Sequence, residues 1–252
     1  MLRYGRDLYN FQVLSDFDLE TSMEDFETAH DAKKNRARIC TWLAKGDEAA
    51  RMLSAKLSQC GEERPCYSGA CHVCMRRMRR GWSARVASAV RADDEQWTAV
   101  SAIPGETFAI GKLNQFDPRV MKARLLKQIK RSQLVSKVAL GGIDFSVEIR
   151  GAQVVWAPHW YFLIKGSRSD VSAALKKYYP TSLFIRRPFE MRMVDKEKVL
   201  RAGSYSLKAA FFLKDRNRPG NWLKPINRTH WLEFAPLLDK WGVIARLIDY
   251  GF

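Results

Sequence analysis

The feature that most constrains the fold is a group of four cysteines between Cys60 and Cys74, in a chain of 252 residues that has five cysteines in all. Their spacing is C-x5-C-x4-C-x2-C in a polar stretch that contains glycine and proline, so unmetallated thiols, the alternative, would have no core to occupy. A structural zinc site takes four soft ligands in a tetrahedron. The spacing predicts such a site from Cys60, Cys66, Cys71 and Cys74, with His72 as a possible substitute for one sulfur.

The charge balance indicates a polyanionic partner. The sequence has 43 Lys and Arg against 27 Asp and Glu, which gives a net charge of +16. A surface of this sign attracts nucleic acid and gains free energy by releasing its counterions, although solubility alone is a simpler explanation. The sequence has no long apolar run and no signal peptide, so we expect no membrane association. Clustered cysteines are typical of a reducing compartment, and we expect the protein in the cytoplasm.

Two predicted helices carry most of the clustered positive charge. Residues 75–91 contain six arginines and no acid, and residues 119–137 contain seven Lys or Arg and no acid. A run of charge is usually a solvated helix face, but two such helices, one of them following a zinc segment, favour contact with a phosphate backbone. The candidate DNA-binding residues are Arg76, Arg77, Arg79, Arg80, Arg85, Lys122, Arg124, Lys127, Lys130 and Arg131.

The pattern of apolar residues predicts an α+β fold with a central antiparallel sheet flanked by helices. Strands are expected at 97–103, 143–149, 153–164 and 182–194, and helices at 23–58 with a break at Gly46, at 73–90, 118–138, 195–213 and 231–247. Candidate core residues near the N-terminus are Phe26, Ile39, Trp42, Leu43, Met52 and Leu57. We expect an N-terminal helical arm at 1–58, a zinc knuckle and basic helix at 59–94, and a nuclease or DNA-binding domain at 95–252.

The two central strands form a predicted hairpin with one polar face. Alternation places Asp144, Ser146 and Glu148 on one face of the first strand, and His159 and Tyr161 on one face of the second. If the two faces coincide, Glu148 and His159 can meet across the strand pair. A carboxylate and an imidazole in this arrangement can hold a divalent cation, although a single histidine among aromatics is more often a packed, hydrogen-bonded residue.

A tyrosine and a lysine share a helix face further along the chain. Tyr205 and Lys208 are three residues apart, which brings both side chains to one side of a helix. A phenol can attack a phosphodiester when a metal polarises the phosphate and a cation stabilises the phenolate. A helical tyrosine is ordinarily a core residue, so this pair is a weak indication when taken alone.

The order of these motifs resembles the rolling-circle replication initiators, the HUH endonuclease superfamily of plasmids and transposons. The cysteine segment followed by arginines is similar to the family's zinc segment. The segment Trp156-Ala-Pro158-His159-Trp-Tyr161 resembles its W-x-P-H-x-H metal motif, and Tyr205-Ser-Leu-Lys208 resembles its Y-x-x-K catalytic helix. The resemblance covers the chain from about residue 60 to the end.

The resemblance implies a metal-dependent nicking reaction. Tyr205 would attack a DNA phosphate and form a 5′-phosphotyrosine link, with assistance from Lys208. Mg²⁺ or Mn²⁺ would be held by His159 and its partners Glu148 and Asp144. One departure from the family pattern is that Tyr161 replaces the second histidine, and a neutral phenol is a poor ligand for a hard cation.

The sequence leaves three functional hypotheses. The first is an enzyme that nicks and joins single-stranded or locally melted DNA, with a host helicase or polymerase as a candidate partner. The second is a relative that has lost nuclease activity and acts as a DNA-binding origin, repressor or accessory protein. The third is a zinc-stabilised assembly protein that binds RNA. The spacing of Tyr205 and Lys208 favours the first, and Tyr161 as nucleophile ranks below Tyr205 because it lies on a predicted strand.

Overall fold

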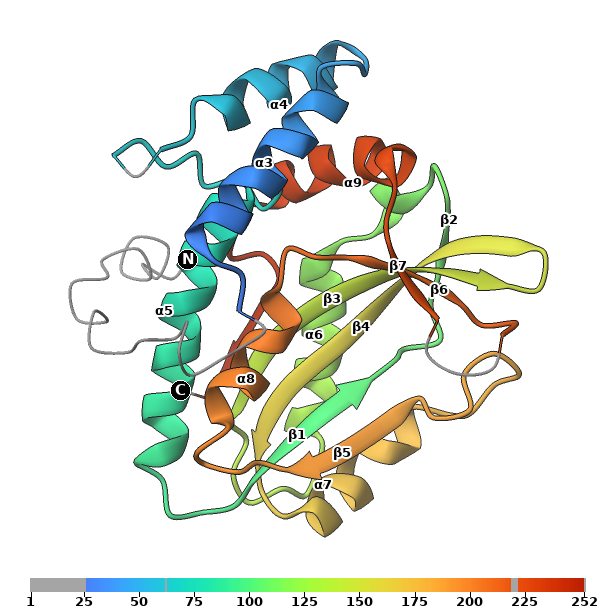
Figure 1. Ribbon diagram of the computed structural model, residues 1–252. Helices are drawn as coiled ribbons and strands as arrows, with labels where there is room; N and C mark the ends of the chain where they lie inside the picture. The colour runs from blue at the N-terminus through green and yellow to red at the C-terminus, as the bar shows by residue number, and fades with distance from the viewer. Residues whose placement is uncertain (1–25, 62, 219–221, 252) are drawn as a thin grey trace.

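A computed structural model describes residues 26–61, 63–218 and 222–251 (Figure 1). The N-terminal part contains helices α3 (Ala29–Leu43), α4 (Glu48–Ser58) and α5 (His72–Arg91). The remainder contains strands β1 (Trp97–Ala102), β2 (Phe108–Ala109), β3 (Ala139–Arg150), β4 (Gln153–Lys165), β5 (Phe189–Met193), β6 (Phe212–Asp215), β7 (Leu223–Pro225) and β8 (Leu247–Tyr250). Its helices are η2 (Leu113–Gln115), α6 (Pro118–Lys130), α7 (Arg168–Leu175), η3 (Lys176–Tyr178), α8 (Val199–Ser204), η4 (Tyr205–Leu207) and α9 (Arg228–Trp241). The α+β prediction is confirmed.

The sheet is mixed rather than purely antiparallel, which corrects one part of the predicted fold. Its strand order is β5-β1-β4-β3-β6-β7, with β2 paired to β4 and β8 paired to β3. The long hairpin of β3 and β4 is central, as expected, and places Asp144 opposite His159. The exception is β6, which runs parallel to β3 from Ser146 to Ile149. Two parallel strands need a crossover connection between them. After β4, the chain passes through strand β5, which pairs with β1, and then through helix α8 before it enters β6.

The two faces of the central hairpin have different chemistry. The apolar face contains Phe145, Trp156 and Trp160, which contact rings of α9 and of the segment after α7. The other face contains Asp144, Ser146, Glu148, His159 and Tyr161, and we call these five residues the polar face. Helix α8 and η4 lie over the polar face, whereas α6 lies on the opposite side of the sheet (Figure 1). The alternation predicted for the hairpin is therefore confirmed.

The described part of the predicted N-terminal arm packs on the rest of the chain. Helices α3 and α4 form a hairpin that lies against α5 and α9 (Figure 1). Lys56 pairs with Asp239 of α9 at 2.7 Å. The expected core residues Phe26, Ile39, Leu43 and Leu57 are buried and Trp42 is half-buried, but Met52 is 69% exposed and its prediction was wrong. Residues 1–25 of the predicted arm lie outside the described residues.

Two predicted helices after residue 194 end earlier than their sequences indicate. The helix expected at 195–213 stops at η4, because the carbonyl of Lys208 accepts hydrogen bonds from the buried Arg246 and the chain then enters β6. The helix expected at 231–247 stops at Gly242, whose φ of 73° favours glycine. The segment after it becomes strand β8. These tertiary contacts override a helical pattern that is local.

Helix α6 begins at the predicted residue, Pro118, but is shorter than expected. The Asp117 side chain accepts from the backbone N–H of Arg119, and Pro118 occupies the first turn. The helix stops at Lys130 instead of continuing to residue 138. The Ser132 hydroxyl donates to the carbonyl of Ile129 at 2.6 Å, which satisfies one carbonyl of the last turn. No helix among the described residues is long and apolar enough to cross a membrane.

Candidate functional site

The four cysteine sulfurs converge on one point. All four ligand atoms lie within 4.8 Å of one another. The Sγ atom of Cys60 is 3.5 Å from that of Cys74 and 3.6 Å from that of Cys71, and Cys66 is 3.7 Å from Cys74. A zinc ion with four sulfurs at ~2.3 Å requires sulfur separations of about 3.8 Å. The cluster is therefore compatible with a structural zinc ion, and no position is left for a substrate.

The knuckle, residues 59–71, is fixed to the domain by close backbone contacts. Cys71 is the residue before α5, so the last two sulfurs come from the first turn of that helix. A Cβ atom added to Gly69 would lie 2.6 Å from the carbonyl oxygen of Leu238, which shows how closely the knuckle approaches the end of α9. His72 does not join the sulfurs, because its Nδ1 atom lies 3.6 Å from the carboxylate of Glu27.

The polar face brings together the histidine and the carboxylate predicted from the alternation. The Nε2 atom of His159 is 3.4 Å from Oε1 of Glu148 and 2.8 Å from the hydroxyl of Ser146. That hydroxyl also donates to Glu148 at 3.2 Å. Glu148, Ser146 and His159 are buried, so these contacts form in a region from which water is largely excluded. The predicted meeting of Glu148 and His159 is confirmed.

Two arginines occupy both oxygens of Glu148. Arg216 donates to Oε1 at 2.5 Å, and Arg150 donates to Oε2 from two nitrogens at 2.8 and 3.0 Å. Burial alone would raise the pKa of Glu148, but the bonds from His159 and Arg216 hold it well below its ordinary value. Burial and the charge of Lys214 lower the pKa of His159 to about 4. At neutral pH the face therefore contains an ionised carboxylate and a neutral imidazole.

Asp144 lies between two cations at the end of the polar face nearest to Tyr205. Its oxygens are 3.4 Å from Nζ of Lys208 and 3.7 Å from a guanidinium nitrogen of Arg246. Arg246 is 1% exposed, and its Nε donates to the carbonyl of Ile143 at 2.7 Å, so the sheet fixes this guanidinium. Burial lowers the pKa of Arg246 to about 10, which leaves the group charged at neutral pH.

The structure brings Tyr205 and Lys208 to the polar face. Nζ of Lys208 lies 4.0 Å from the centre of the Tyr205 ring, and the rings of Tyr205 and Tyr161 meet edge to face at 4.9 Å. Tyr205 is 42% exposed, so its side chain is accessible from solvent. Tyr161 is more deeply placed, and burial and the charge of Asp144 raise its pKa. A phenol in that environment stays neutral and is unsuited to be a metal ligand or a nucleophile.

The residues expected to hold Mg²⁺ or Mn²⁺ do not fit such an ion. Glu148 has both oxygens engaged by guanidinium groups, and Asp144 faces Lys208 and Arg246. Magnesium requires several oxygen ligands at 2.0–2.1 Å in an octahedron. Within residues 26–61, 63–218 and 222–251, the cysteine cluster is the one group of three or more His, Cys, Asp or Glu side chains close enough to share an ion.

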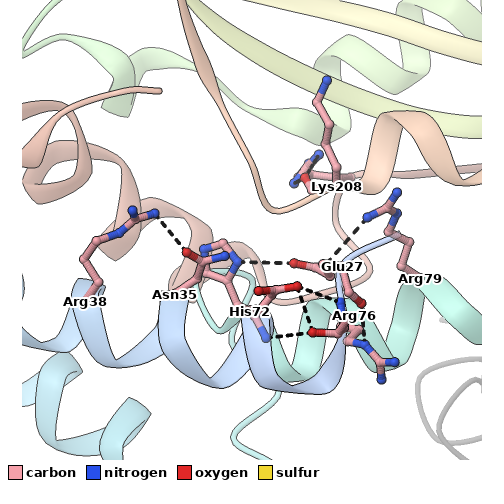
Figure 2. Close-up of polar contacts among 10 residues, drawn as sticks. Glu27, Asn35, Arg38, His72, Arg76, Arg79 and Lys208 are labelled. Atoms are coloured by element: carbon pink, nitrogen blue, oxygen red, sulfur yellow. Dashed lines mark hydrogen bonds and ion pairs between the residues drawn. The ribbon is translucent and has the colours of Figure 1, made fainter. Parts of the chain in front are cut away.

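The arginines of α5 do not form a freely exposed surface. Arg76 and Arg79 are each 8% exposed, which differs from the solvated helix face expected for phosphate contact. Figure 2 shows Glu27 between His72 and Arg79, with Arg76 donating from Nε to the Glu27 carbonyl at 2.8 Å. These arginines instead connect α5 to the segment that enters α3. Arg77, Arg80 and Arg85 are half-buried, and their contact with DNA stays a prediction.

The second basic helix, α6, lies across the sheet from Tyr205. Arg124 contacts the ring of Trp160 on the apolar face at 5.5 Å and pairs with Glu106 at 3.1 Å. Lys127, Lys130 and Arg131 are exposed, and Lys122 is half-buried. The two basic helices therefore do not form one continuous surface next to the tyrosine. The DNA contacts of α6 stay a prediction.

Sequence reasoning identified Lys208 but missed the other cations of the polar face. Arg150 is two residues after Glu148 on the same strand, so alternation alone could have placed it on the polar face. Lys214 and Arg216 come directly after a segment predicted as helix, and β6 brings them beside β3. Arg246 lies far along the chain, and no local pattern indicates that it contacts Asp144. We call Arg150, Lys208, Lys214, Arg216 and Arg246 the cationic group.

Comparison of the chain with protein-family models, with curated proteins and with solved structures gave no match in any of the three.

Proposed function

We propose that this protein binds single-stranded or locally melted DNA and nicks and rejoins it through Tyr205, as an initiator-like strand transferase. One observation carries the proposal: an accessible tyrosine and a lysine lie together over a buried polar face, with Nζ of Lys208 4.0 Å from the Tyr205 ring and 3.4 Å from Asp144. Oriented charges in a region that excludes water stabilise developing charge better than solvent does.

The proposed step is a transesterification in which atoms and charge balance. The hydroxyl oxygen of Tyr205 bonds to the phosphorus of a DNA phosphodiester, and the bond from phosphorus to the 3′ oxygen breaks. The phenol releases its proton to solvent, and the departing 3′ oxygen takes up one proton to become a hydroxyl. The products are a 5′-phosphotyrosine link and a free 3′-hydroxyl, and the reverse reaction rejoins the strand.

A DNA-binding protein without nuclease activity is the second candidate. The observation that favours it is the pairing of Glu148 with Arg150 and Arg216, which leaves no carboxylate of the polar face free of a cation. In that case Tyr205 would be a stacking surface for a base, a role that exposed aromatic side chains perform in single-strand binding.

A covalent trapping assay separates the two candidates. Single-stranded DNA carrying a label on the 3′ side of the cleavage point is incubated with wild-type protein, with Tyr205→Phe and with Tyr178→Phe, another tyrosine outside the polar face. The nickase predicts label on wild type and on Tyr178→Phe, and at least a hundredfold less on Tyr205→Phe, because the nucleophile is lost. Binding of DNA without labelled protein across a diverse substrate pool would contradict the nickase.

We further propose that the cysteine cluster binds one structural zinc ion. Cys66 and Cys40 are both half-buried, but only Cys66 belongs to the cluster, so Cys40→Ser is a matched control for Cys66→Ser. Cys66→Ser should lose most of the zinc found by elemental analysis and unfold at lower temperature, since binding of structural zinc contributes to folding free energy. Equal zinc content and equal unfolding temperature in the two variants would contradict the site.

A further inference from the structure

The electrostatics of the polar face are those of an anion site. Five basic side chains, the cationic group, surround two carboxylates, Asp144 and Glu148. The basic charge therefore exceeds the acidic charge at the position where the family resemblance expects a divalent cation. Both carboxylates already have cationic partners, so an added metal ion would face an excess of positive charge in a region of low dielectric.

The cations differ in what they can reach. Arg246 is 1% exposed and Arg150 has a side chain 10% exposed, so these two neutralise the carboxylates inside the fold. Lys208, which lies beside Tyr205, and Arg216, which lies beside Glu148, keep 16% and 26% of their side chains exposed. The bond from Arg216 to Glu148 uses Nη2, one of the three guanidinium nitrogens. Its guanidinium therefore retains donor capacity beyond its bond to Glu148.

We propose that the polar face binds a phosphate group of the nucleic acid directly, through Lys208 and Arg216, with no divalent cation between protein and phosphate. This inference rests on the proposed function and deepens it. Guanidinium and ammonium groups can perform the electrostatic part of phosphoryl transfer that a metal performs elsewhere, because they clamp the oxygens on which charge develops. The negative charge of one phosphate also balances part of the excess positive charge of the cationic group.

The first arm of the test measures metal binding directly. Mn²⁺ is titrated into zinc-loaded protein and free Mn²⁺ is followed by its electron paramagnetic resonance signal. The thiolate cluster does not compete, because soft sulfur ligands strongly prefer zinc. The inference predicts the same weak, non-saturating uptake for wild type and for Asp144→Asn. Stoichiometric Mn²⁺ binding that Asp144→Asn or His159→Gln abolishes would overturn it.

The second arm measures phosphate binding without depending on cleavage. The probe is a fluorescent single-stranded oligothymidine of about five nucleotides, and its affinity is measured by anisotropy with and without Mg²⁺. Loss of a charge-assisted contact in Lys208→Gln or Arg216→Gln should weaken binding about tenfold. Lys208→Arg keeps the charge and should retain most of the affinity. Arg187→Gln is the charge-matched control, since Arg187 is 84% exposed beside the edge strand β5.

The two arms distinguish failure of this inference from failure of the proposed function. Affinity that does not require Mg²⁺ and is lowered only by the Lys208 and Arg216 substitutions supports the phosphate site, even if no covalent product forms. Affinity that is gained only when Mg²⁺ is added, or that Lys208→Gln and Arg216→Gln leave equal to that of Arg187→Gln, overturns it. Trapping that requires added Mn²⁺ would also overturn it while leaving Tyr205 as the nucleophile.

Discussion

At the scale of single residues, the polar face depends on keeping His159 neutral beside an ionised carboxylate. Its imidazole is 1% exposed, donates to or accepts from Ser146, and lies near Lys214, whose charge disfavours a second positive charge. A histidine that must stay neutral in the folded state destabilises that state when the unfolded chain can take up a proton.

The stability of the protein should therefore fall with pH in a defined window. Burial lowers the pKa of His159 to about 4 from an ordinary 6.5. Above pH 6.5 the imidazole is neutral in both the folded and the unfolded chain, and folding stability is not reduced. As the pH falls from 6.5 toward 4, only the unfolded chain takes up the proton, so folding stability decreases. Between pH 7.5 and 5 the loss should be about 2 kcal/mol in the free energy of urea unfolding. His159→Asn should flatten this slope, whereas the exposed His30→Asn should leave it unchanged. Equal slopes in both variants would show that His159 does not titrate as described.

The sequence predicts the position of a residue at the site only when its partners there are close to it along the chain. Alternation along the hairpin placed Asp144, Ser146, Glu148 and His159 on one face, and the spacing of four cysteines placed the sulfurs together. Arg216 and Arg246 could not be assigned, because each reaches the polar face through a tertiary contact made by β6 or by the end of the chain. These two cations, which alternation and spacing do not indicate, are what distinguishes the observed polar face from the divalent-metal site expected from the resemblance.

At the scale of elements, the knuckle and α9 support each other through a contact that only glycine permits. The added Cβ at Gly69 would meet two backbone oxygens, those of Leu238 at 2.6 Å and Gly242 at 3.1 Å. Backbone atoms in a helix end cannot move aside as a flexible side chain can. The position of the cysteine cluster relative to the domain therefore depends on this residue.

Gly69→Ala should destabilise the protein, because the new methyl group separates the knuckle from α9. A change that forces backbone shifts in a packed region costs about 1–3 kcal/mol, measured by denaturant unfolding of the zinc-loaded protein. Gly105→Ala is the matched control, since a Cβ there meets nothing within 4 Å, and it should be neutral within about 0.5 kcal/mol. A smaller cost for Gly69→Ala than for Gly105→Ala would contradict the described docking.

Element boundaries were less predictable than element types. The pattern of residues 195–213 is helical in isolation, but Arg246 binds the carbonyl of Lys208 and the following residues pair with β3. Gly242 ends α9 early and frees the last segment to become β8. In each case a partner distant in sequence decides the outcome, and local periodicity contains no information about that partner.

At the scale of the whole molecule, the positive charge is divided between two sides of the sheet. The cationic group lies on the polar face, while exposed Lys127, Lys130 and Arg131 lie on α6 across the sheet. A net charge of +16 gives long-range attraction, but one short strand cannot contact both sides at once. We expect a long single strand to pass around the domain and a short one to occupy the polar face alone.

Oligonucleotide length should therefore separate the two surfaces. Replacing Lys127, Lys130 and Arg131 together by glutamine should weaken binding of a strand of about 30 nucleotides. It should also reduce the slope of log affinity against log salt by about 2, for three lost phosphate contacts at ~0.7 each. Binding of a strand of about five nucleotides should stay within twofold of wild type. Equal losses for both lengths would contradict the separation of the surfaces.

The most direct test of the central claim is the chemical identity of the DNA attachment. Protein trapped on single-stranded DNA is digested with nuclease and trypsin, and the nucleotide-bearing peptide is sequenced by mass spectrometry. We predict one modified residue, Tyr205, formed in equal yield without added divalent metal. A nucleotide on Tyr161, or no modified peptide under conditions in which the DNA is bound, would contradict the claim that Tyr205 over the polar face transfers DNA strands.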